Sequence, residues 1–172
     1  MQKLEIKDLP DVVTAAYTTA EAWVQERFRG RRVAPRPFVV SMPIPDIEGD
    51  ADARLFAVIV PLSGEARARV SKAVTATQVA KDRGVEALEA AGDQLMSLLL
   101  VEGCYWVGGL ARPDGTLDQM PQPRDPRDPR PAARDYLKDL RGEPGALGMA
   151  YDQFAAAVLQ TMEAPEVRLG KL

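Results

Sequence analysis

The side chain best suited to covalent chemistry is the single cysteine of this chain, Cys104, which Tyr105 and Trp106 follow directly. A cysteine acts as a nucleophile when a cation or a helix N-terminus stabilises its thiolate. The sequence contains no histidine, which excludes cysteine–histidine and serine–histidine pairs and every histidine metal site. Because free cysteines are among the residues most often buried, we expect Cys104 to be a core residue.

Four carboxylates alternate along the segment 46–52, an arrangement that could suit a hard cation. In calcium loops the sixth residue is a glycine and the twelfth is a glutamate. Counted from Asp46, the fourth residue is Gly49 and the twelfth is Ala57, so the spacing does not fit. We therefore expect a solvated loop and no metal site at these residues, which are Asp46, Glu48, Asp50 and Asp52.

Asp114 and Asp118 are the remaining candidates for acid–base chemistry, because two carboxylates can share that work. Asp114 stands in a Pro-Asp-Gly turn and Asp118 follows it closely. Without histidine, the side chain whose pKa lies nearest neutrality, an enzyme becomes a weaker interpretation. A small carboxylate enzyme is therefore the third reading, and we predict no catalytic residue and no cofactor.

The overall charge bears on the class of partner. The formal net charge is −3 and the isoelectric point is about 5.1, whereas binding to nucleic acid needs a basic surplus. The basic cluster "RGRR", with Arg27 and Arg36 nearby, more often complements a helix end. The longest apolar stretch, "LMSLLLVEGCYWVGGL", contains Glu102 and is shorter than the roughly 20 residues of a membrane span. We expect neither nucleic acid nor a membrane as partner.

Helical periodicity is clearest between Leu9 and Phe28, where apolar residues recur every three or four positions. The tail "EVRLGKL" is not expected to order by itself. Further helices are expected from the capping residue Ser63 to Gly84, from Val85 onward, within 134–145, and from Ala146 to Ala164, before Pro165.

Two runs of β-branched and aromatic residues, 37–45 and 54–62, predict strands. Both alternating faces of the second run are apolar, which is typical of a strand covered on both sides. The polar segment between the runs predicts an antiparallel pair. The stretch 98–110 is apolar but contains three glycines, so a frayed helix end and a short third strand both remain open. The expected fold class is α+β, predominantly helical with a small antiparallel β-sheet.

The segment 121–134, "PQPRDPRDPRPAAR", contains five prolines and repeats the triplet Arg-Asp-Pro. Its minimal PxxP spacings occur in polyproline II peptides that dock into aromatic grooves. The balanced content of arginine and aspartate instead favours a solvated, semi-rigid spacer. We predict three parts: an α+β body over 1–120, a proline-rich spacer arm over 121–134, and C-terminal helices and tail over 135–172, packed on the body.

One succession of features resembles a known family. "PIPDIEGDADARLFAVIVPLSGEARARV" joins a Pro-x-Pro-acidic-x-x-Gly turn and an apolar strand to Leu-Ser-Gly-Glu and Arg67 at a helix start. A leucine-rich helix follows, then "LLLVEGCYWVGGLARPDGT" with its Pro-Asp-Gly turn, and then a closing amphipathic helix. This order, over residues 43–163, resembles the tail assembly chaperones of long-tailed bacteriophages. The helix Leu9 to Phe28 and the proline insertion depart from it.

The resemblance implies a non-catalytic protein of the host cytoplasm that binds the long, aggregation-prone tape-measure helix during tail assembly. Helices with narrow alanine-rich faces could shelter such a partner in an apolar groove. The alternative is a structural component of the virion, such as a head-to-tail connector, a tail terminator or a related subunit. In that case the arm and the tail order against neighbouring subunits. In either case the partners are proteins of the tail or connector, and a homo-oligomer also remains open. The candidate partner-binding residues are Pro123, Pro126, Pro129, Trp106, Tyr151 and Phe154.

Overall fold

The structure is a computed structural model and describes residues 2–32, 35–45, 53–111 and 117–169. Five antiparallel strands form one sheet in which the order of the strands is their order in the sequence. The expected antiparallel pair is confirmed, with Phe38 opposite Ile59 and Met42 opposite Leu55. The strands are β1 (Gln2–Leu4), β2 (Phe38–Pro43), β3 (Arg54–Ile59), β4 (Cys104–Ala111) and β5 (Leu117–Gln119).

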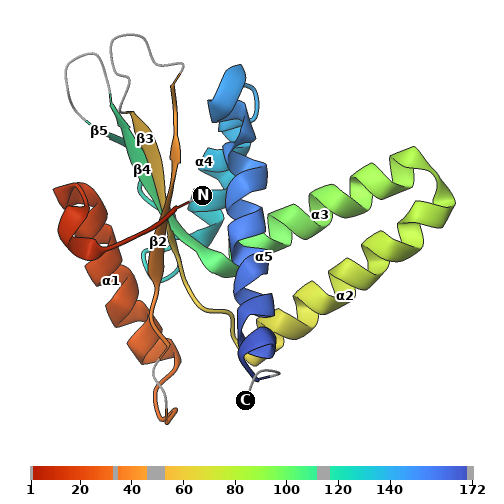
Figure 1. Cartoon of the computed structure of the whole chain (residues 1–172), viewed down its shortest axis with the longest axis horizontal. Coiled ribbons are helices and arrows are strands. Elements are labelled where there is room, and N and C mark those ends of the chain that lie inside the picture. Colours follow the sequence, from red (N-terminus) through yellow and green to blue (C-terminus); the bar gives the residue numbers. More distant parts are fainter. Residues whose placement is uncertain (1, 33–34, 46–52, 112–116, 170–172) are drawn as a thin grey trace.

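Helices cover both faces of this sheet (Figure 1). Helix α1 (Asp11–Arg27) lies on one face and contacts β3 and β4. Helices α4 (Arg130–Leu140) and α5 (Ala150–Leu169) lie on the other face. Residues 55–59 of β3 are therefore buried whichever way their side chains point, which confirms the expected strand with two apolar faces.

A helical hairpin connects β3 to β4 and projects away from the sheet (Figure 1). It consists of α2 (Gly64–Ala80), a 3-10 turn (Lys81–Arg83) and α3 (Val85–Gly103). The Ser63 hydroxyl accepts a hydrogen bond of 3.1 Å from the Ala66 amide, so the expected helix cap is confirmed. Gly84 ends the turn with φ of 104°, a backbone conformation that favours glycine.

The stretch 98–110, for which helix and strand were both open, contains one of each. Helix α3 runs to Gly103 and β4 begins at Cys104. A Cβ atom on Gly103 would lie 2.9 Å from Cγ2 of Val158 and closer still to its Cγ1. The glycine therefore allows α5 to pack directly against the junction between helix and strand.

The C-terminal helices differ from the sequence-based expectation at both ends. Helix α4 begins at Arg130, inside the segment assigned to the arm. The last helix, α5, begins at Ala150 after a 3-10 turn (Gly145–Met149) and continues through Pro165 to Leu169. The expected stop before Pro165 is wrong, since α5 continues past this residue even though a proline removes one backbone donor from a helix interior.

The fold class is α+β and predominantly helical, as expected. Its core lies between the sheet and the helices on its two faces, and it includes Leu55, Leu100, Leu137 and Phe154, all fully buried. Among the described residues, no helix is both long enough and apolar enough to cross a membrane.

Candidate partner-binding groove

An open groove of about 330 Å³ lies between α1 and the proline-rich segment 121–129. Its first wall is α1, which contributes Val12, Ala15, Ala16 and Thr19. These positions follow the i, i+3, i+4, i+7 spacing of one helical face. Because the side chains are short, another chain can approach the α1 backbone closely along this wall.

The floor of the groove is aromatic. Tyr105 and Trp106 of β4 both line it, although they are only 5% and 9% exposed. A Cβ atom on Gly108 would lie 2.6 Å from the Trp106 ring, so the absence of a side chain there makes room for the indole. Large, nearly dry aromatic surfaces of this kind are common at the centre of protein interfaces.

The second wall is the proline-rich segment itself, which contributes Pro123, Pro126 and Pro129. Hydrogen bonds connect this part of the chain to the body. Just before the segment, the Met120 amide donates to the Val107 carbonyl over 3.0 Å, and within it the Arg127 carbonyl accepts from Trp23 Nε1 of α1 over 2.9 Å. The segment therefore lies on the body as a wall of the groove.

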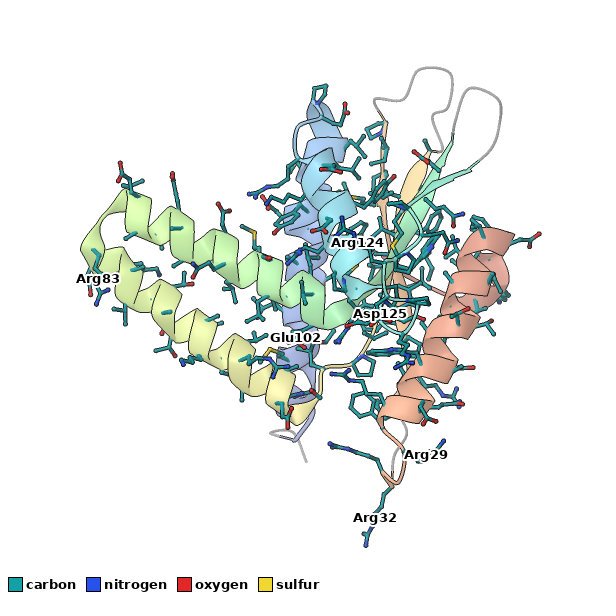
Figure 2. The ribbon with its side chains drawn as sticks, turned by 180° about the vertical axis from the view of Figure 1, so that it is seen from behind. Arg29, Arg32, Arg83, Glu102, Arg124 and Asp125 are labelled. Atoms are coloured by element: carbon teal, nitrogen blue, oxygen red, sulfur yellow. The ribbon has the colours of Figure 1, made fainter. Side chains whose placement is uncertain are left out.

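Arg130 anchors the end of this wall. Its guanidinium donates to both carboxylate oxygens of Asp128, over 2.7 and 3.1 Å, in a two-pronged geometry. It also donates to the Glu102 carbonyl over 3.1 Å and lies 3.6 Å from Glu102 Oε2. The other carboxylate oxygen of Glu102 binds Arg69 over 2.8 Å. Because Arg130 and Glu102 are almost fully buried, this cluster holds the arm and the start of α4 against the base of the hairpin, where Figure 2 shows Glu102.

Trp23 lies between two guanidinium groups. The Arg27 and Arg130 groups are each 5.0 Å from the centre of its ring, and Tyr105 packs against it with 5.5 Å between ring centres. Cation–π contacts of this kind stabilise most when water is excluded. Trp23 thus joins α1, β4 and the arm at the end of the groove.

The pKa shifts in this region follow from burial and from charge. Burial raises the pKa of Tyr105, and the charge of Asp128 raises it further. For Asp128, burial alone would raise the pKa, but the hydrogen bonds and the charge of Arg130 outweigh it and the pKa is lowered. Burial lowers the pKa of Arg27, and the neighbouring Arg130 adds to this. The arrangement favours a neutral phenol and an ionised Asp128.

Cys104 lies at the first position of β4 and is fully buried, which confirms the expected core thiol. Burial raises its pKa to about 12. The thiol is therefore protonated at neutral pH and is shielded from solvent.

Four of the six predicted partner-binding residues meet in the groove: Pro123, Pro126, Pro129 and Trp106. The other two lie elsewhere. Phe154 is fully buried in the core, and Tyr151 is 3% exposed, with the Arg141 guanidinium 4.5 Å from its ring centre. Tyr151 lines a separate open pocket beside Arg134 and Arg141, whereas a partner could reach Phe154 only after the surrounding helices had moved.

Of the acidic candidates, only Asp118 lies within the residues that the structure describes. Asp118 is half-buried on β5, while Asp114 and the acidic loop 46–52 lie outside the described residues. Within the part of the chain that the structure describes, no group of three or more metal-ligating side chains is found.

Three residues of this region, Trp23, Glu102 and Arg130, were not among the predicted ones. One signal was visible for Glu102, because a carboxylate within an apolar run must be paired when that run is buried. No comparable signal exists for Trp23 or Arg130, whose spacing fits an ordinary amphipathic helix and an ordinary solvated arm.

A scan of protein-family models, a search of curated proteins and a search of solved structures each returned no match to this chain. The groove is therefore interpreted from its own geometry.

Proposed function

We propose that this chain is a non-catalytic bacteriophage assembly protein, a tail assembly chaperone that holds a helical segment of the long tape-measure protein. The observation that carries the proposal is the groove between α1 and the proline-rich segment. It combines a wall of short side chains, an aromatic floor and a proline wall held by the hydrogen bond from Trp23 and by the pairing of Arg130 with Asp128.

The dimensions of the groove suit a helix that inserts a few apolar side chains. A volume of about 330 Å³ holds two or three side chains of leucine size, which is how an amphipathic helix engages a groove. The walls need little rearrangement, because α1 is packed on the sheet and Arg130 fixes the arm. A small apolar contact also allows release when the partner assembles, as a chaperone requires.

The test is affinity capture by the tagged, full-length chain from its native lysate, with mass spectrometry of the bound proteins. Capture of a very long coiled-coil chain, with the bait absent from finished particles, supports the chaperone. Capture of ring-forming capsid or tail proteins in fixed stoichiometry, with the bait present in particles, supports the structural virion component. Capture of neither overturns both.

Two neighbouring threonines of α1 provide a matched pair of variants. Both are exposed and both donate a hydrogen bond to the carbonyl four residues earlier, but Thr19 lines the groove and Thr18 does not. Thr19→Arg should reduce capture of the partner by about tenfold, because a long cation would fill an apolar groove. Thr18→Arg should leave capture unchanged. Equal capture by both variants would exclude the groove as the binding site.

A further inference from the structure

The outer half of the α2–α3 hairpin lies away from the sheet and leaves apolar side chains in contact with water (Figure 1). Val85 is 72% exposed, the highest value among the large hydrophobic residues described, and Val79 is 47% exposed. Val74 and Leu88, further along the two helices, are only half-buried. Towards the base, by contrast, Val70, Leu99 and Leu100 are buried. The hairpin therefore has a packed base and an incompletely packed outer half.

The two arms of the hairpin carry opposite charge. Residues 64–83, which form α2 and the turn, contain five cationic and two acidic side chains, a net charge of +3. Helix α3 contains four acidic side chains and no cationic one, a net charge of −4. Among the residues that the structure describes, one ion pair joins the two helices, between Arg69 and Glu102 at the base. Figure 2 shows Arg83 at the far tip, well away from Glu102.

Most of these charges have no counter-ion nearby. Within the described part of the chain, no ion pair involves Lys72, Lys81, Arg83, Glu86 or Glu89, and all five residues are exposed. Opposite charges that are held on adjacent helices without pairing provide a complementary surface for a second molecule.

One side of the hairpin combines the apolar and the charged residues. Thr77 Oγ1 lies 3.5 Å from the Ala91 carbonyl, which fixes the sides of α2 and α3 that face each other. Helical periodicity then places two stripes on the same flank of the hairpin. The α2 stripe is Val74, Gln78 and Lys81, and the α3 stripe is Val85, Glu89 and Gly92. A Cβ atom on Gly92 would meet nothing within 4 Å, so this flank is open.

We propose that two copies of this chain pair through this flank, with α2 of each copy packed against α3 of the other in a four-helix bundle. The charges select this arrangement. A two-fold axis parallel to the helices places the basic α2 of each copy on the acidic α3 of the other copy. It also keeps the two tips at the same level, so that Lys81 of each copy meets Glu89 of the other. A two-fold axis across the hairpin would place like charges together.

The size of the surface sets the expected affinity. The outer half of the hairpin is about 12 Å long and the helix pair is about 20 Å wide, which gives a footprint of about 250 Å² per copy. Twice this value lies below the usual range of specific interfaces, so the dimer should be weak, with a dissociation constant near the millimolar range.

The test is analytical ultracentrifugation of the full chain from about 10 µM to about 2 mM, a range that brackets this affinity. The average mass should rise from 18.7 kDa towards twice that value. Lys81→Glu and Glu89→Lys should each raise the dissociation constant by roughly tenfold or more, because each creates two repulsive contacts in a symmetric dimer. The combined variant should dimerise again, because its charges are exchanged on both helices.

Lys72→Glu is the matched control, because Lys72 is also exposed on α2 but lies outside the stripe. It should leave the dissociation constant within about twofold. A chain that stays monomeric over the whole range would overturn the proposal. So would a dimer that both single variants leave intact, or a combined variant that stays monomeric.

This proposal stands apart from the groove. Thr19→Arg should not alter self-association, and Glu89→Lys should not directly alter the groove, so the two proposals can fail separately.

Discussion

Helix α3 passes through two environments, and the contrast between its ends explains much of the molecule. At its C-terminal end, Leu99, Leu100 and Gly103 are buried where α3 meets the sheet and α5, and the buried Glu102 belongs to the ion cluster around Arg130. At its N-terminal end, Val85, Glu86 and Glu89 are exposed at the hairpin tip. One regular helix therefore connects a densely packed body to a lightly packed projection. Stability should be concentrated at the body end, which leaves the projection available for contacts with other molecules.

The largest expected effect is the loss of Arg130 from the body. Arg130→Met would leave the buried carboxylate of Glu102 with only Arg69 and would release Asp128. Removing one member of a buried ion pair typically costs about 3 to 5 kcal/mol, which urea denaturation followed by tryptophan fluorescence would measure. Arg29→Met is the control, because the Arg29–Glu26 pair is exposed and should contribute less than about 1 kcal/mol. Similar costs for the two variants would show that the cluster does not anchor the arm.

The two glycines of α3 test the contrast within a single helix. Gly103→Ala would force a methyl group into Val158, a stiff β-branched side chain, and should cost about 1 to 3 kcal/mol. Gly92→Ala meets open space and should stabilise the chain by about 0.5 to 1 kcal/mol, since alanine favours a helix interior. Thermal denaturation of both variants gives the comparison. Two changes of the same sign would mean that the hairpin is packed as densely as the body.

The alkaline stability of the body should depend on Cys104. Its pKa is raised to about 12 in the folded chain by burial, whereas an exposed thiol titrates near 8.5. The unfolded chain therefore releases this proton first, so the stabilisation is complete below about pH 8 and is lost as the pH rises towards 12. Urea denaturation gives the free energy of unfolding of the chain and of Cys104→Ala. The value for the chain minus that for the variant should fall by about 1.4 kcal/mol per pH unit above about pH 8.5. A constant difference would mean that the thiol is accessible.

The smallest effect is expected at the start of the hairpin. Ser63→Ala removes the cap of α2 and should cost about 1 kcal/mol. Native-state hydrogen exchange should show faster exchange in α2, with the amides of β3 and β4 less affected. A uniform loss of protection would indicate that hairpin and body unfold as one unit.

Much of the fold could be predicted from local pattern. The spacing of Val13, Tyr17, Ala20 and Val24 gives α1 its buried face, and the unbroken apolar run of β3 indicates burial on both sides. The change from α3 to β4 could not be placed, because an apolar run looks the same in a buried helix and in a buried strand. At this boundary Gly103 lies against Val158, 55 residues further along the chain, and a local pattern does not reveal such a contact. Strands β1 and β5 are too short, at three residues each, to leave a periodic signal.

The groove was only partly predictable for a related reason. Proline spacing and an aromatic residue pointed to Pro123, Pro126, Pro129 and Trp106, because these types are common in recognition surfaces. Tyr151 and Phe154 belong to types that serve the core equally well, and sequence alone does not separate the two uses. The hydrogen bond from Trp23 to Arg127 spans 104 residues, so no local pattern could reveal that the arm lies on the body.

The position of the hairpin in the chain has a consequence for its length. Strands β3 and β4 are adjacent and antiparallel, with Ile59 opposite Cys104, so the whole hairpin occupies the place of a turn (Figure 1). The pairing of the strands depends only on the two ends of this insertion. Seven residues added to each helix would lengthen the projection by about 10 Å. The register of β3 and β4 and the order of the strands would stay the same. The length of the hairpin can thus change through insertions and deletions of whole helical turns, while the sheet and the helices that cover it keep their structure.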